Sequence, residues 1–203
     1  MPVLLLAVVA IALVVSGISP TDRLTWLMEV LPVLIAAPLL IATRRSFPLT
    51  SLLYLLIAAH ALILIYGGAY TYAHVPLGFW MEDWFGLSRN PYDKIGHFAQ
   101  GFVPALVARE ILLRGRYLNP RHRLMAGFLS GCVAMAVSAV YELIEWGAAV
   151  IMGQGADEFL GTQGYEWDTQ SDMGFALLGA LVALTLLSRW HDRQMARLAV
   201  KPV

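Results

Sequence analysis

Long apolar stretches separated by short polar segments form the pattern of the whole chain. An α-helix needs about 20 predominantly apolar residues to cross the hydrocarbon core of a bilayer. The pattern therefore predicts an all-α fold, a polytopic membrane bundle of six transmembrane helices in one domain, residues 1–203. The predicted spans are residues 3–19, 24–43, 49–72, 91–113, 124–151 and 169–190.

The first two spans have features of their own. The first has no Lys or Arg before its apolar run and no clear small-residue cleavage site, so we expect a span and not a signal peptide. The second contains Pro32 and Pro38, which predict a kink. A membrane bundle can absorb such a kink because neighbouring helices satisfy the backbone groups that it frees.

Two segments between the spans differ from ordinary loops. Residues 76–89, PLGFWMEDWFGLSR, are rich in aromatic side chains and predict an interfacial segment with Trp80 and Trp84 at headgroup depth. Residues 152–167, MGQGADEFLGTQGYEW, are rich in glycine and lack a long apolar run. They predict an outer loop, which is either a functional lid or a solvated connector.

Arginine and lysine residues orient the bundle. They follow spans two and six and surround the link between spans four and five, with only Arg23, Arg89 and Lys94 on the opposite side. By the positive-inside rule, both termini are expected in the cytoplasm. The acidic residues are distributed in the opposite way, since all except Glu110 and Asp192 lie in outer loops or outer halves of spans. Acidic residues contribute little to topology, so this asymmetry needs another cause.

Composition supports the membrane class. Hydrophobic residues make up 59% of the chain, charged residues 14%, and the mean hydropathy is +0.66. A soluble domain has roughly 45–50% apolar and about 25% charged residues. The formal net charge of +0 gives no reason to expect nucleic acid as a partner, whereas membrane lipids are expected. The single cysteine, Cys132, excludes an intrachain disulfide and a cysteine-based metal motif.

Three spans carry pairs of polar residues at helical spacing. The pairs are Asp93 and His97 in span four, Glu142 and Glu145 in span five, and Asp168 and Asp172 in span six. Residues three or four apart share a helix face. At about 1.5 Å per residue, His97 and Glu145 lie about 9 Å below the outer ends of their spans and Asp172 about 6 Å. The acidic residues were not used to assign the orientation, which rests on Arg and Lys alone. Their location on the same side of the membrane at similar depth is therefore independent of it, and it predicts one outward-facing acidic pocket.

Some of these residues also have structural interpretations. Asn90 is a good N-cap, Pro91 fits the first helical turn, and Asp93 then occupies a position typical of a near capping box. Asp168 can cap span six in the same way. His97 alone would more often be a satisfied core histidine than a ligand.

Glu142 and Glu145 have no capping role, and a charge at the centre of a membrane helix costs roughly 2.5–3.5 kcal/mol on insertion scales. Lys94 is the only nearby basic side chain on the outer halves of these spans, and one ammonium cannot neutralise so many carboxylates. A divalent metal ion bound between the carboxylates could neutralise them. Carboxylates with one imidazole suit Mg, Mn, Ca or Fe(II), and Zn is also compatible.

We therefore expect a metal site drawn from one set of side chains and no other cofactor. The expected ligands are His97, Glu142, Glu145, Asp172, Asp93 and Asp168, and the candidate catalytic residues are Glu142 and Lys94. The sequence contains no Gly-x-Ser-x-Gly motif, no phosphate-binding loop and no dinucleotide fingerprint.

Small residues continue below each polar pair on the same helix face. They are Ser138, Ala134, Gly131 and Gly127 in span five, Gly101, Ala105 and Ala108 in span four, and Ala176, Gly179 and Ala183 in span six. Small residues let membrane helices approach closely. They predict a tight three-helix core under the polar pocket.

The segments DKIGHFAQGFVPALVAREILLR, YELIEW and WDTQSDMGFALLGA resemble the YjdF-like family of uncharacterised bacterial inner-membrane proteins, over about residues 20–190. The DKIGHF and WDTQSDMG segments are also similar to VanZ-like proteins. The first resemblance implies a multi-pass protein of the bacterial inner membrane, and the second implies a role in the cell envelope or glycopeptide resistance. Both identify Lys94 and the six candidate ligands as motif positions. Glu145 and Asp172 stand where the VanZ-like pattern more often has Gln and Asn.

Three functions are compatible with these features. The first is a metal-dependent enzyme acting on a lipid or lipid-linked envelope substrate at the outer leaflet, with a metal activating water or polarising an oxygen and a carboxylate as base. The second is a cation or proton transporter that uses the same carboxylates, although no second polar group follows below Ser138. The third is a non-catalytic structural or assembly protein whose buried acids pair with Lys94, Arg89 or a partner protein. We favour the first.

Overall fold

The computed structural model describes residues 2–119, 121–152 and 165–199, and within them the chain forms helices and no strands. The helices are α1 Pro2–Ile18, α2 Arg23–Thr43, α3 Ser51–Ala69, α4 Pro76–Phe85, α5 Tyr92–Arg114, α6 Arg123–Met152, α8 Asp168–Leu186 and α9 Ser188–Ala199. The prediction of an all-α fold is therefore confirmed for the described part of the chain.

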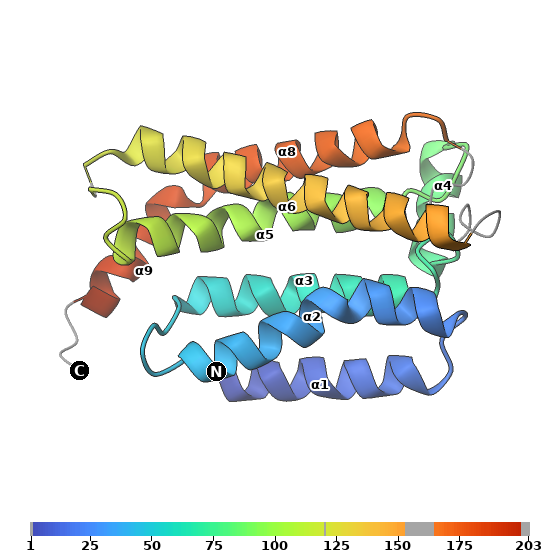
Figure 1. Cartoon of the computed structure of the whole chain (residues 1–203), viewed down its shortest axis with the longest axis horizontal. Coiled ribbons are helices and arrows are strands. Elements are labelled where there is room, and N and C mark those ends of the chain that lie inside the picture. Colours follow the sequence, from blue (N-terminus) through green and yellow to red (C-terminus); the bar gives the residue numbers. More distant parts are fainter. Residues whose placement is uncertain (1, 120, 153–164, 200–203) are drawn as a thin grey trace.

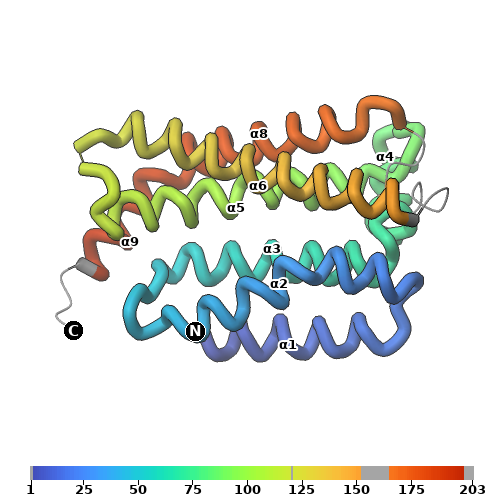
Figure 2. The backbone as a smooth tube through the Cα atoms, viewed as in Figure 1, coloured from blue at the N-terminus to red at the C-terminus, as the bar shows by residue number. Residues whose placement is uncertain are grey.

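Six long helices form two groups of three (Figure 1). Helices α1, α2 and α3 make one group, α5, α6 and α8 make the other, and α3 packs against α5 to join them. The short helix α4 lies at one end of the bundle and α9 lies at the other (Figure 2). We call these ends the α4 end and the α9 end.

Four helices, α2, α3, α6 and α8, are long and apolar enough to cross a membrane. Helix α1 is apolar but shorter, with 17 residues. Helix α5 has 23 residues but carries charged residues near both of its ends, such as Lys94 and Glu110. This arrangement is consistent with a membrane-embedded helical bundle.

The helix ends differ from the predicted spans at two places. The third span ends at Ala69 and not at residue 72, because Thr71 and Tyr72 adopt positive φ angles of 55° and 54° in a sharp turn before α4. The sixth span ends at Leu186, and a second helix, α9, starts at Ser188. The predicted span extends to residue 190 because Leu187 and Trp190 follow Leu186, although Ser188 and Arg189 between them are polar.

The segment expected at headgroup depth forms α4, which Gly86 ends in the left-handed conformation with φ of 63°. Trp80 and Trp84 are exposed, as expected for side chains at a membrane interface. The predicted outer loop, residues 152–167, lies largely outside the described residues, so its role as a lid stays a prediction.

Asn90 lies next to the start of α5, although the N-cap residue is Pro91 and not Asn90 as predicted. Its side-chain oxygen accepts a hydrogen bond from the Tyr92 N–H at 3.1 Å, and its amide donates to the Val75 carbonyl at 3.0 Å. Because Val75 directly precedes α4, one buried side chain couples the start of α5 to the start of α4.

Helices α5 and α8 approach to backbone contact at two glycines. A methyl group on Gly101 would lie 1.7 Å from the Ala176 carbonyl oxygen, and one on Gly179 would lie 2.0 Å from the Phe98 carbonyl oxygen. The predicted close packing is thus confirmed for these two helices. On α6 the two predicted glycines do not make such a contact, since a methyl group on Gly127 or Gly131 would meet open space, whereas Ala126, Ser130 and Ala134 are fully buried.

A buried polar cluster ties α9 to the bundle at the α9 end. The carboxylate of Glu110, which has no exposed surface, lies 2.7 Å from His191 Nε2 and accepts hydrogen bonds from the Thr50 hydroxyl at 2.8 Å and the Thr50 N–H at 3.1 Å. Arg114 also donates to it. Nearby, the carboxylate of Asp192 pairs with a second arginine, Arg109, at 2.6 Å. These contacts connect α9 to the start of α3 and to α5.

The two kinds of glycine give a matched stability test. We expect Gly101→Ala to lower the free energy of unfolding by about 1–3 kcal/mol, because overpacked sites cost that much. Gly131→Ala adds the same methyl group in open space and should leave stability unchanged or slightly higher, since Gly in a helix costs roughly 0.5–1 kcal/mol relative to Ala. Thermal unfolding of both variants in detergent measures the difference, and equal effects would contradict the close α5–α8 contact.

Candidate functional site

The polar residues singled out in three spans project from α5, α6 and α8 near the α4 end. Two groups form where their side chains meet. One contains Asp93, Asp168 and Asp172, and the other contains His97, Glu142 and Asp172. All of these side chains are buried, and Asp172 belongs to both groups.

Lys94 lies at the centre of the three aspartates. Its Nζ is 2.7 Å from Asp172 Oδ1, 2.9 Å from Asp168 Oδ1 and 3.3 Å from Asp93 Oδ2. Arg89 adds a second cation, 2.6 Å from Asp168 Oδ1 and 3.7 Å from Asp93 Oδ2. A buried charge is tolerated when it is paired and hydrogen-bonded. These two basic side chains therefore account for the presence of the three aspartates at this depth.

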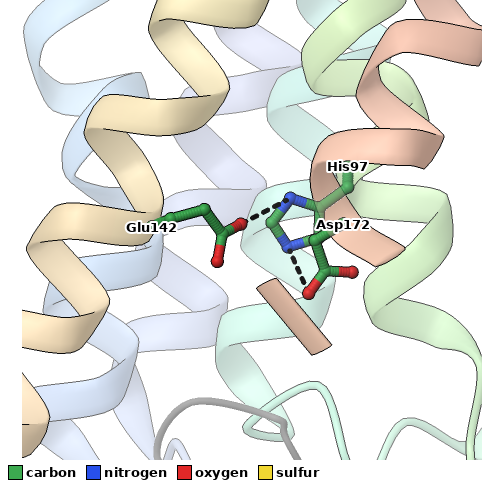
Figure 3. A group of neighbouring side chains, drawn as sticks. All are labelled: His97, Glu142 and Asp172. Carbon is green, nitrogen blue, oxygen red and sulfur yellow. Dashed lines mark ion pairs between the residues drawn. The ribbon is translucent and has the colours of Figure 1, made fainter. Parts of the chain in front are cut away.

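The imidazole of His97 lies between two carboxylates (Figure 3). Its Nδ1 is 3.7 Å from Glu142 Oε1, and its Nε2 is 3.7 Å from Asp172 Oδ2. Nδ1 also lies 3.2 Å from the side-chain oxygen of Gln100, one turn further along α5. Glu142 Oε1 is buried and has no hydrogen-bond partner among the described residues.

This second group has the chemistry of a metal site. Its three ligand atoms lie within 4.8 Å of one another. Ligands bound to one ion at about 2.0–2.2 Å can be at most about 4.4 Å apart, so a small inward movement would suffice. In the tautomer with the proton on Nδ1, His97 donates to Gln100 and leaves its Nε2 lone pair available. Metal-ligating histidines are usually oriented in this way by a hydrogen bond from the other ring nitrogen.

Glu145, a predicted ligand, joins neither group among the described residues. It lies one turn along α6 from Tyr141 and Glu142 and is only partly buried. Tyr141 points to the other half of the bundle, because its hydroxyl donates to Glu29 Oε2 on α2 at 2.9 Å. Of the two glutamates that the sequence groups in span five, only Glu142 belongs to one of these two ligand groups.

Sequence reasoning missed three polar residues near the site. Glu29 is the single acidic residue within α2, and His60 on α3 has a buried Nε2 without a hydrogen-bond partner among the described residues. Gln100 contacts His97 directly. Ionisable residues inside membrane spans are rare and usually functional. A search of the spans for every ionisable residue, in addition to the pairs at helical spacing, would have identified Glu29 and His60.

Long apolar helices around a cluster of buried ionisable side chains define a multi-pass helical membrane protein. A family model described as a predicted membrane protein family, DUF2238, matches residues 1–193, and the chain belongs to that family. The inner membrane protein YjdF of Escherichia coli (strain K12) is 65% identical over 185 residues, which cover 91% of this chain and 88% of the relative. No solved structure matches the chain significantly.

These comparisons confirm the resemblance to the YjdF-like family and the location in the bacterial inner membrane. The resemblance to VanZ-like proteins, and with it a role in the cell envelope, stays a prediction based on two short segments. Neither the family description nor the name of the relative states a reaction, a metal or a partner.

The central position of Lys94 gives a stability test. We expect Lys94→Met to lower the free energy of unfolding at neutral pH by about 3–5 kcal/mol, because removing one partner of a buried ion pair leaves an uncompensated charge. Thermal unfolding in detergent at neutral pH measures this loss.

Two further variants separate charge from packing at this position. Lys94→Arg keeps the charge and should lose less stability than Lys94→Met. The double variant Lys94→Met/Asp172→Asn removes one carboxylate together with the cation and should recover part of the loss. A Lys94→Met protein as stable as the parent at neutral pH would show that the lysine does not hold the aspartates together.

Proposed function

We propose that this protein is a metal-dependent membrane enzyme that acts on a lipid or lipid-linked envelope substrate. The observation that carries the proposal is the meeting of His97, Glu142 and Asp172 from three different helices, with ligand atoms within 4.8 Å. The unpartnered Glu142 Oε1 adds to it, because a buried carboxylate oxygen without a donor is costly unless a proton or a cation satisfies it.

The proposal includes six spans with both termini in the cytoplasm. In this orientation 11 of the 14 Lys and Arg residues lie on the cytoplasmic side, and only Arg23, Arg89 and Lys94 lie on the outer side. Helix α1, with 17 residues, would be about 25 Å long, which is close to the thickness of a bilayer core. In this orientation α9 lies on the cytoplasmic side, and α4 and the candidate site lie on the outer side.

Each residue of the site then has a chemical role. Gln100 orients His97 through Nδ1, and Lys94 holds one oxygen of Asp172 while the other faces His97. A divalent ion held by His97, Asp172 and Glu142 would activate water or polarise a phosphoryl or acyl oxygen. The oxygen of Glu142 that does not hold the ion would accept a proton as general base, and Lys94, fixed by three aspartates, would stabilise negative charge on the substrate.

A second candidate function, proton or cation transport, is favoured by one specific observation. The two nitrogens of His97 face two different carboxylates, so a proton could arrive at one nitrogen while another leaves from the other. The sequence argument against transport was the lack of a polar group below Ser138. Glu110 and His191 form such a group at the α9 end. Proton flux in proteoliposomes that is lost in Glu145→Gln or Glu142→Gln, without any bound metal, would support transport over catalysis.

A third candidate, a non-catalytic structural protein, is supported for part of the site. Lys94 and Arg89 pair with the three aspartates, as that hypothesis requires. It does not account for His97 and Glu142, whose contacts of 3.7 Å are longer than hydrogen bonds.

The orientation can be tested with single cysteines. The native Cys132 is exposed on the bundle surface, so it is first replaced in a Cys132→Ser background. We expect a membrane-impermeant maleimide to label Glu82→Cys on α4 in intact spheroplasts. It should label Arg197→Cys on α9 only after permeabilisation. Labelling of both residues in intact spheroplasts, or of neither, would contradict the six-span topology.

The metal is tested by elemental analysis of the purified protein. We expect one divalent ion per chain after incubation with Mg, Mn, Ca, Fe(II) or Zn and removal of excess. Glu142→Gln and His97→Ala should lose it, and Gln100→Leu should weaken affinity by about 10–100-fold, as is typical when a group that orients a ligand is removed.

Asp168→Asn is the matched control for the metal, because Asp168 belongs only to the group around Lys94 and should leave binding intact. No stoichiometric metal in the parent protein would refute the proposal. Loss of metal in Asp168→Asn but not in Glu142→Gln would indicate that the metal binds at the three aspartates instead.

A further inference from the structure

A cavity separate from these two ligand groups lies beside the candidate site at the α4 end. It is a cavity of about 620 Å³ formed by α4, α5, α8 and the segment between α4 and α5. Small-molecule sites usually have volumes of about 300–1,000 Å³, so this cavity has the size of a ligand site. None of the three residues proposed to hold a metal lines it.

The polar part of the cavity lining consists of hydroxyl groups and two basic side chains, which are paired with aspartates that do not themselves line the cavity. Its basic side chains are Arg89 and Lys94, its hydroxyl groups come from Ser88, Ser171 and Tyr165, and no carboxylate is among the described residues that line it. The Arg89 guanidinium lies 4.6 Å above the ring of Tyr165, which restricts its orientation. Arginine, lysine and hydroxyl donors together suit a phosphate group.

The remaining lining is apolar. Met81 from α4 and Ile95, Phe98 and Phe175 from α5 and α8 face the cavity. Ile95 and Phe98 lie one and two turns into α5, while Arg89 precedes this helix. The cavity therefore has a polar region near the start of α5 and an apolar wall that extends along the helices.

The depth of the cavity indicates what reaches it. Trp80, Trp84 and Phe85 on α4 are strongly exposed, and Met81 on the same helix lines the cavity. Exposed tryptophans at the end of a membrane bundle mark the headgroup region. Phosphate groups of lipids occupy that region, and their hydrocarbon chains extend from it in the direction of the apolar wall.

We infer that this cavity binds the phosphate-bearing head group of an outer-leaflet lipid. The phosphate contacts Arg89, Lys94 and the hydroxyl groups, the first part of the hydrocarbon chain lies along Ile95, Phe98 and Phe175, and the rest of the chain stays in the bilayer. This inference rests on the proposed function and its orientation, and it gives the substrate class of that site. Lys94 connects the cavity with the candidate metal site, since its Nζ also lies 2.7 Å from Asp172 Oδ1.

The test measures lipid binding to the full-length protein in detergent by native mass spectrometry. The probes are dioleoylphosphatidylglycerol, dioleoylglycerol with the same chains and no phosphate, and inorganic phosphate. We expect the phospholipid to bind at least tenfold more tightly than dioleoylglycerol, and inorganic phosphate not to compete at millimolar concentration. Equal binding of the two lipids, or full competition by inorganic phosphate, would overturn the inference.

Variants locate the binding in the cavity. Arg89→Gln removes one cation with little change of shape, and Ser171→Trp fills the cavity, so each should weaken phospholipid binding at least tenfold. Leu177→Trp introduces the same bulky side chain at an exposed position of α8 outside the cavity and should have no effect. Unchanged binding in Arg89→Gln would overturn the inference even if Ser171→Trp failed to fold.

Bound metal, measured on the same samples, separates the two proposals. A protein that binds phosphatidylglycerol selectively in the cavity but holds no metal supports the lipid site and refutes the metal-dependent enzyme. A protein that holds one metal ion but does not distinguish the two lipids refutes the lipid site and leaves the metal site standing. Arg89→Gln should keep its metal, and His97→Ala should keep its phospholipid.

Discussion

Charge that is buried away from water must find its partner inside the bundle, and the arrangement at the α4 end follows from this constraint. Three aspartates on two helices surround one ammonium group, and Arg89 holds two of them from outside. Asp172 is shared, because its second oxygen faces His97. The ion pairs of Lys94 and the contacts of His97 with Glu142 and Asp172 therefore form one continuous network. A change of charge in one part of this network alters the electrostatic environment of the other part.

The close approach of α5 and α8 makes this network geometrically feasible. Gly101 and Gly179 bring the two backbones into contact, and the polar residues lie near the α4 ends of the same two helices. Side chains as short as aspartate can then reach Lys94 from the neighbouring helix. Helix α6 has fully buried small residues of its own, Ala126, Ser130 and Ala134, and it contributes the longer side chain of Glu142.

Helical periodicity and the positive-inside rule predict the helices and the common depth of His97, Glu142 and Asp172, because these depend on local sequence. The pairing of Tyr141 with Glu29 depends on how α6 rotates against α2, which no local pattern specifies. The same rotation decides that Glu142, and not Glu145, faces His97. The end of α8 at Leu186 differs from the predicted end at residue 190, because Leu187 and Trp190 extend the apolar pattern around the polar Ser188 and Arg189. The central place of Lys94 follows from packing of two helices that are far apart in sequence.

The cluster around Glu110 has a consequence for the order of assembly. Glu110 is on α5, but its partner His191 is on α9, the last helix that the ribosome delivers among those described. Until α9 emerges, this carboxylate has only Thr50 and Arg114 beside it, and Arg109 lacks Asp192. The two charged side chains at this end of α5 are therefore fully paired only after α9 has packed against the bundle.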